Sequence, residues 1–299
     1  MSFFANILTA ALAGALLLLP AAASARVRVV ATIPDFAQIA EEIGGSRVRA
    51  SSLVKPTQDP HYVDPRPSMM VELSRADLLL LAGMELESGW LPPLLTGSRN
   101  RRIQRGAPGY LDCSTLIEPM DVRVPDRAMG DIHPGGNPHY WFDPRNGLRV
   151  ARGIANALEL ADPAGAEQYR AGLEDFTARL QARMDEWQRR LAPHRGKEIV
   201  VYHESWVYFF DWAGLIQFAA LEPKPGIPPS PSHVADLMRR ARGRNVSLVV
   251  QESFYPTSLS SVVAKRIGAR LKVLPVMTGA GGTKTYIDLM DRLVAELTD

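Results

Sequence analysis

The sequence predicts an α/β protein with two lobes, each built on a mostly parallel sheet flanked by helices, joined by one long backbone helix. Short apolar runs typical of strands alternate with helical patterns in both halves of the chain. A long amphipathic pattern with helical spacing separates the two halves. Strands that alternate with helices favour parallel sheets covered on both faces.

The first half starts with the apolar run 27–33, which predicts a strand. Pro34-Asp35 then opens a helix that Gly44-Gly45 closes, because proline suits a first helical turn and glycine a helix end. A second strand is predicted at 47–54 and a third at 76–83, with a short helix at about 67–75 between them.

The pattern loosens between residues 96 and 138. Residues 118–138 contain several prolines and glycines and lack hydrophobic periodicity, so we expect a long surface loop. Loops of this length are uncommon and usually have a function or are mobile.

Residues 163–191 carry the strongest helical pattern, with Asp162 as N-cap, Pro163 in the first turn and Pro193 after the end. Apolar residues recur every three or four positions and form one continuous face. They are Tyr169, Leu173, Phe176, Leu180, Met184, Trp187 and Leu191.

Strand and helix patterns alternate again beyond this helix. Strands are predicted at 197–203, 217–221, 246–252 and 271–276, and helices at 204–213, 233–243, 257–269 and 285–297. We therefore expect an N-terminal lobe at 26–160, a linking helix at 161–193 and a C-terminal lobe at 194–299.

The first 25 residues indicate a signal peptide. An apolar run from Leu8 to Leu19 precedes Ala23-Ser24-Ala25, a small-residue cleavage site that would leave Arg26 as the first residue. The run carries no Lys or Arg on its N-terminal side. A retained membrane anchor is the alternative, but the run is short for a span and Pro20 interrupts it. These features predict secretion.

Composition excludes some functions. The formal net charge is +2 and both signs are interspersed, so the sequence shows no basic patch of the kind that binds nucleic acid. Cys113 is the one cysteine, so no intramolecular disulfide can form and a metal site would need histidines and carboxylates. Cys113 does not follow the apolar run, so we expect no lipid anchor.

Three of the six histidines are the candidate metal ligands. His61 follows the second predicted strand, His139 lies between the loose segment and the next helix, and His203 ends the strand 197–203. Open α/β folds bind ligands beyond the carboxyl ends of their strands. We therefore expect these three imidazoles to share one site.

The segments around His61 and His139 are near duplicates. Each histidine follows a proline, precedes a tyrosine and is soon followed by Asp-Pro, at Asp64 and Asp143. Proline on both sides restricts the backbone, which would hold an imidazole in a cleft at little entropic cost.

Glu252 ends the strand 246–252, as His203 ends its own strand, and is the candidate fourth ligand. The alternatives are a hydrogen-bond acceptor for a ligand histidine or a cap for the following helix. Glu204, Asp59 and Asp143 are weaker candidates, which we expect to support the ligands rather than bind metal. His133, in a Gly/Pro-rich segment, either catches metal transiently or is a solvated loop residue.

At this point the sequence resembles the substrate-binding proteins of zinc and manganese ABC importers, the ZnuA and TroA type. The resemblance rests on Asp59-Pro60-His61-Tyr62-Val63-Asp64-Pro65, on Pro138-His139-Tyr140-Trp141-Phe142-Asp143-Pro144, and on His203 before Ser205-Trp206. It also includes the segments VVATIPDFAQIAEEIGG and ADLLLLAGMELESGW and covers nearly all of the chain after residue 25. It implies two four-stranded lobes on a rigid helix, with metal between them and His61, His139 and His203 as ligands.

The chain departs from the family pattern twice. The usual fourth ligand is an aspartate in the loop after the last strand, but here Val276 to Gly282 contains no carboxylate. This raises Glu252, or a water molecule, as the replacement. Many zinc members also have a His-rich loop before the second ligand, where this chain has His133 alone.

The resemblance implies a periplasmic protein that delivers a divalent metal to the permease of an ABC importer in the inner membrane. Three imidazoles and at most one carboxylate favour Zn²⁺ as cargo. Mn²⁺, which prefers more oxygen ligands, ranks second, and Fe²⁺, which such a site could also bind, ranks third. A zinc hydrolase is the rival, but neither an H-E-x-x-H motif nor a G-x-S-x-G motif is present. We therefore expect a monomeric binding protein and not an enzyme.

Overall fold

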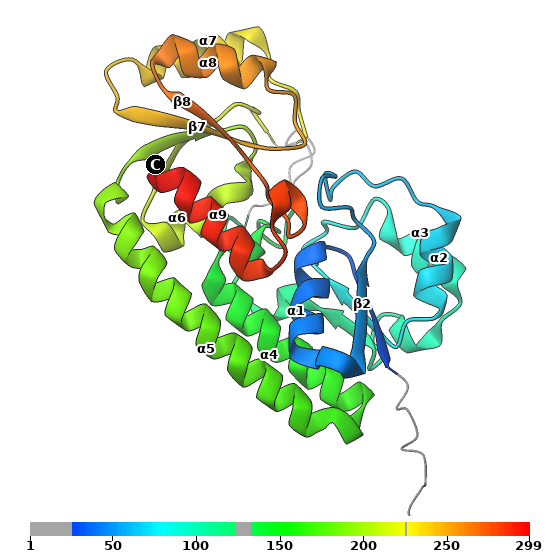
Figure 1. The fold of residues 1–299 in the computed structure, drawn as a ribbon. Helices are drawn as coiled ribbons and strands as arrows, with labels where there is room; N and C mark the ends of the chain where they lie inside the picture. The colour runs from blue at the N-terminus through cyan, green and yellow to red at the C-terminus, as the bar shows by residue number, and fades with distance from the viewer. Residues whose placement is uncertain (1–25, 123–132, 225) are drawn as a thin grey trace, which may run out of the picture.

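Two parallel sheets, each flanked by helices, form the framework of the computed structural model, which describes residues 26–122, 133–224 and 226–299 (Figure 1). The predicted signal peptide lies outside the described residues, as do residues 123–132 of the predicted loop 118–138. Among the described helices, none is long and apolar enough to cross a membrane.

The strands are β1 (Val27–Ala31), β2 (Val48–Ser52), β3 (Leu78–Leu81), β4 (Tyr110–Asp112), β5 (Glu198–Val201), β6 (Ile216–Ala220), β7 (Val246–Glu252) and β8 (Arg270–Leu274). The α-helices are α1 (Pro34–Gly44), α2 (Pro67–Ser74), α3 (Leu91–Ser98), α4 (Pro144–Ala161), α5 (Ala166–Leu191), α6 (Val207–Ala213), α7 (Pro231–Ala241), α8 (Ser258–Ile267) and α9 (Tyr286–Thr298).

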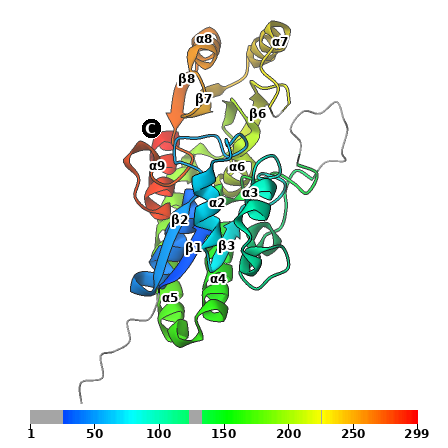
Figure 2. The same ribbon diagram turned by 90° about the vertical axis from the view of Figure 1, so that its right-hand side faces the viewer.

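The first sheet has the order β2-β1-β3-β4 and the second the order β6-β5-β7-β8, and the neighbouring strands of both are parallel. Figure 2 shows β1, β2 and β3 side by side. The predicted fold class is confirmed. Strand β4 was missed, because it is three residues long and lies in the segment with a loose pattern.

Helix α5 contains the predicted apolar face. Tyr169, Phe176, Leu180, Trp187 and Leu191 are fully buried on it. The helix starts three residues later than predicted, because residues 163–165 form a 3₁₀ turn.

One continuous core connects the two sheets. It contains residues of β1 and β3 in the first sheet, of α4, α5 and α9, and of β5 and β7 in the second sheet. Helix α9 packs against α5 and α1, and Trp187 of α5 donates a hydrogen bond to Asp291 of α9 (2.7 Å). A smaller cluster lies under α7 and α8. Because close-packed cores deform little, this shared core restricts movement between the two halves.

Candidate metal centre

Three histidines from distant parts of the sequence meet at one point. The ring centroids of His61, His139 and His203 lie 5.0–5.2 Å apart in each pair. One nitrogen from each ring lies within 4.8 Å of the others, a grouping that could hold a metal ion. The side chains of His61 and His203 are 5% and 6% exposed, and His139 is 4% exposed.

The fold positions these histidines at the ends of strands. His61 lies in the loop between β2 and α2, and His203 lies two residues after the end of β5. His139 precedes a 3₁₀ turn, Tyr140–Phe142, that leads into α4. The carboxyl ends of parallel strands meet at one edge of a sheet, so the two sheets present their ligand-bearing loops to each other.

Each imidazole is oriented by a hydrogen bond at Nδ1. The Nδ1 atom of His61 pairs with Asp59 Oδ1 (2.8 Å), that of His139 with Asn137 Oδ1 (2.9 Å), and that of His203 with Glu222 Oε2 (2.6 Å). An acceptor at Nδ1 fixes the proton there and leaves Nε2 unprotonated to bind a metal. The Nε2 atom of His61 is buried and has no hydrogen-bond partner in the described part of the chain.

The surroundings of His139 and His203 shift their pKa values in opposite directions. Burial lowers the pKa of His139 well below its ordinary value, and the neighbouring histidines lower it further. Burial also opposes the charged form of His203, but the hydrogen bond to Glu222 and the charges of Glu252 and Asp59 outweigh it and raise the pKa. His139 is therefore neutral, and ready to coordinate, over a wider pH range than His203.

Glu252, the last residue of β7, lines the same small cavity as the three histidines. Its Oε1 atom accepts a hydrogen bond from Trp206 Nε1 (3.0 Å). Its Oε2 atom is buried without a hydrogen-bond partner among the described residues. Burial raises the pKa of Glu252 to about 7, because desolvation of the charge outweighs the stabilisation by His203, by the Glu252 backbone and by Ser205 and Trp206.

The cavity between these side chains has a volume of about 10 Å³. That is about the space of one water-sized sphere, so a single ion fits and an organic substrate does not. The aromatic side chains of Trp141, Phe142 and Phe254 help to line it. Trp141 lies against His139, with ring centroids 5.3 Å apart, and Phe142 stacks on Trp206 behind it, with centroids 5.1 Å apart. Tyr62 does not belong to this wall, because it is 59% exposed.

The comparisons with known proteins agree with this geometry. Residues 29–299 match the family described as "Zinc-uptake complex component A periplasmic", ZnuA. The chain belongs to this family.

Individual relatives differ in the metal that their names state. The manganese-binding lipoprotein MntA of Halalkalibacterium halodurans is 26% identical over 88% of this chain and 84% of its own length. The iron-binding protein YfeA of Yersinia pestis is 26% identical over 92% of this chain and 86% of its own. A crystal structure of ZnuA superimposes with a TM-score of 0.77 at 28% identity, covering 91% of this chain and 97% of that one.

Family membership confirms two predictions from the sequence. The chain is a substrate-binding component of a metal ABC importer, and it is not an enzyme. The four strands per lobe that the resemblance implied are also present.

The weaker candidates for metal ligands make contacts that differ from those of the three clustered histidines. Asp143 caps α4 by accepting from the Arg145 backbone (2.8 Å) and forms an ion pair with the Arg145 side chain. Glu204 offers its backbone carbonyl to Asn137. The ring of His133 lies 5.4 Å from that of His61, at the edge of the cluster.

Sequence reasoning missed two residues of the centre, Asn137 and Glu222. Asn137 had a detectable signal, because it precedes His139 by two positions, as Asp59 precedes His61. Glu222 lies 19 positions after His203, just beyond β6, and only the pairing of β5 with β6 brings the two together.

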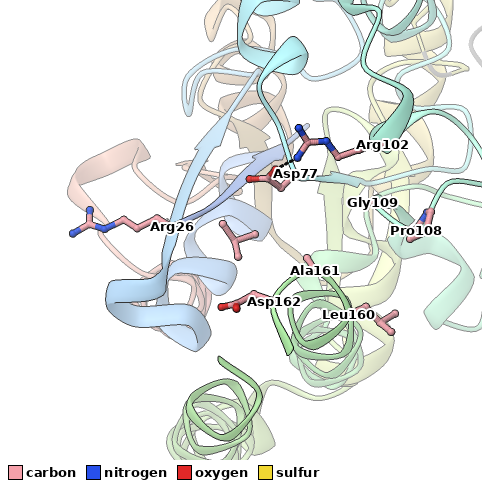
Figure 3. A pocket seen from close by; sticks show the side chains of 9 residues that line it. Arg26, Asp77, Arg102, Pro108, Gly109, Leu160, Ala161 and Asp162 are labelled. Carbon is pink, nitrogen blue, oxygen red and sulfur yellow. Dashed lines mark hydrogen bonds and ion pairs between the residues drawn. The ribbon is translucent and has the colours of Figure 1, made fainter. Parts of the chain in front are cut away.

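A larger hollow lies elsewhere and lacks this chemistry. It has a volume of about 470 Å³, and Arg26, Asp77, Arg102 and Asp162 are among its lining residues (Figure 3). It lies at the amino ends of β1 and β3, and Arg102 is paired with Asp77 across it. No histidine lines it, so it is not a candidate for the metal centre.

Proposed function

We propose that this protein captures one zinc ion with His61, His139, His203 and Glu252 and delivers it to the permease of an ABC importer. The observation that carries the proposal is the convergence of three buried imidazoles whose Nδ1 atoms are each hydrogen-bonded. Three neutral imidazoles and one carboxylate form a tetrahedral set typical of Zn²⁺.

Glu252 fits the fourth position better than a helix cap or an acceptor for a ligand histidine. The Nδ1 atoms of all three histidines pair with other residues, so Glu252 is not needed there. Its buried Oε2 has no hydrogen-bond partner in the described structure and lines the cavity. A buried carboxylate oxygen is costly unless a proton or a cation satisfies it.

Manganese and iron are the alternative cargoes, since relatives are named for them. Mn²⁺ is harder than zinc and favours more oxygen ligands, whereas imidazole ligands suit Fe²⁺ as well as Zn²⁺. The candidate set of three nitrogens and one carboxylate is the tetrahedral set typical of zinc, so we rank zinc first.

We further propose that the protein is a secreted periplasmic monomer without a lipid anchor. Residues 1–25 have the features of a cleaved signal peptide, and no cysteine follows the apolar run. We also propose that residues 26–160 form the N-terminal lobe, residues 194–299 form the C-terminal lobe, and residues 161–193 link them.

Calorimetric titration of metal-stripped protein with Zn²⁺ and Mn²⁺, alongside the Glu252→Ala variant, tests the assignment. We expect one tight zinc site, weak manganese binding and a loss of zinc affinity in the variant. Tight manganese binding would overturn zinc as cargo, and unchanged zinc affinity in the variant would remove Glu252 from the ligand set.

A further inference from the structure

Asn137 connects the loop of one candidate ligand to the loop of another. Its Oδ1 atom accepts hydrogen bonds from the backbone N (3.0 Å) and from Nδ1 (2.9 Å) of His139. Its Nδ2 atom donates to the backbone carbonyl of Glu204 (2.7 Å), the residue directly after His203. The residue is 9% exposed, so these bonds form in a largely dry environment.

The orientation of this amide follows from its partners. A backbone N–H can only donate and a carbonyl can only accept, so the oxygen must face His139 and the nitrogen must face Glu204. All three bonds are made only by an amide in this orientation.

Asp59 occupies the equivalent place before His61 but is a carboxylate. Its Oδ1 atom accepts from His61 N (3.0 Å) and Nδ1 (2.8 Å), the same two bonds that Asn137 makes to its histidine. Its other oxygen accepts from the hydroxyl of Tyr255 (3.3 Å), which follows β7 of the second sheet. Across the cleft Asp59 therefore meets a donor, whereas Asn137 meets an acceptor.

We infer that Asn137 is a positioning residue that couples the orientation of His139 to the placement of the His203 loop, and that its amide is required for this coupling. The inference rests on the proposed metal capture at these histidines. An aspartate at 137 would keep both bonds to His139 but would place a carboxylate oxygen against the Glu204 carbonyl. That contact repels, and the link between the two loops is lost.

This coupling affects release of the ion more than its encounter with the site. The link preorganises two ligands from opposite sides of the cleft, so losing it lets one ligand detach while the other stays bound. We therefore expect zinc to dissociate at least about tenfold faster from Asn137→Asp than from the unchanged protein, within the range typical of residues that orient ligands. The added negative charge would by itself slow dissociation, which makes faster release a stringent result.

Three variants separate the link to Glu204 from the two bonds to His139. Asn137→Asp loses only the link to Glu204, Asn137→Ala loses all three bonds, and Asp59→Asn is the matched control. An asparagine at 59 keeps an acceptor for His61, and its amide can still donate to the Tyr255 hydroxyl. Zinc release is followed by stopped-flow competition with a chelator. Imidazole ¹⁵N chemical shifts report the tautomer of His139. Amide hydrogen exchange in the metal-free protein reports how readily the backbone of residues 203–206 opens to solvent.

We expect the tautomer of His139 to persist in Asn137→Asp and to be lost in Asn137→Ala. Exchange at 203–206 should increase in both Asn137 variants and stay unchanged in Asp59→Asn. Release and exchange in Asn137→Asp that match the unchanged protein would overturn the inference. If the unchanged protein fails to bind zinc, the proposed function fails instead, and the exchange data still test the link.

Discussion

Trp206 donates its indole N–H to one carboxylate oxygen of Glu252, and the other oxygen of Glu252 stays buried beside His203 without a hydrogen-bond partner in the described structure. The indole therefore fixes the direction of the carboxylate while leaving one oxygen available. Burial raises the pKa of this group to about 7, so the carboxyl group in the metal-free site takes up a proton as the pH falls through neutrality.

Zinc capture should therefore release protons. Glu252, with a pKa of about 7, and His203, with a raised pKa, must both be deprotonated to bind a cation. Affinity should rise with pH through about 7 and fall below about pH 6. Calorimetry at pH 6.5 in buffers of different ionisation enthalpy gives the number of protons that are released when zinc binds. The Glu252→Gln variant should release fewer protons than the unchanged protein. Equal heats in all buffers would contradict this linkage.

Glu222→Gln should weaken zinc binding about 10- to 100-fold, as is usual for residues that orient a ligand histidine. The change removes the carboxylate that holds Nδ1 of His203 at 2.6 Å. Competition with a chromogenic chelator measures the affinity. Glu174→Gln, at an exposed position on α5, is the matched control and should leave the affinity unchanged. Identical affinities in the two variants would show that Glu222 does not support the site.

Glu87 should link the stability of the protein to pH independently of the metal centre. It is 4% exposed and accepts from Thr32 Oγ1 and from the backbone of Ala82 and Gly83. Burial nevertheless raises its pKa from 4.5 to about 7. Because the folded pKa is the higher one, this group stabilises the fold fully below about pH 4.5, and that contribution is lost as the pH rises through 7.

The full effect of the Glu87 shift is about 3 kcal/mol at most, at 1.36 kcal/mol per pKa unit. Urea unfolding of the metal-free protein and of Glu87→Gln, each at pH 5 and pH 8, isolates the contribution of Glu87. The contributions of other titrating groups cancel in the difference in unfolding free energy between the two proteins. We expect the unchanged protein to lose stability relative to the variant as the pH rises. A difference that does not change with pH would disprove the linkage.

Gly172 allows α5 to pack closely on the end of α1. A Cβ built there would lie 2.2 Å from the carbonyl oxygen of Ile43, which is backbone and cannot rotate away. Gly172→Ala should therefore destabilise the fold by about 1–3 kcal/mol despite the better helix propensity of alanine. Gly89→Ala is the control, because a Cβ there meets nothing within 4 Å. Urea unfolding compares the two, and equal stabilities would contradict the packing argument.

The sequence was most informative where a local pattern determines the structure. The apolar face of α5 and the alternation of strands and helices have fixed periods, so the fold class could be predicted from them. The grouping of His61, His139 and His203 could be expected because each lies near the carboxyl end of a strand or at a lobe junction.

Long-range contacts were harder to predict. Glu222 meets His203 only because β6 pairs with β5, and the Glu204 carbonyl meets Asn137 only because the two halves face each other. Strand β4 was missed because three residues are too few to show a period. The amide at 137 and the carboxylate at 59 differ because of partners that no local pattern reveals.

X-ray absorption at the zinc edge of the zinc-loaded protein tests the central claim most directly. Three imidazole nitrogens at about 2.0–2.1 Å and one carboxylate oxygen at about 2.0–2.2 Å are the expected ligands. Glu252→Ala should alter the oxygen shell and leave the three imidazole contributions in place. A spectrum with fewer than three imidazoles, or with six mostly oxygen ligands, would contradict a centre built from His61, His139 and His203.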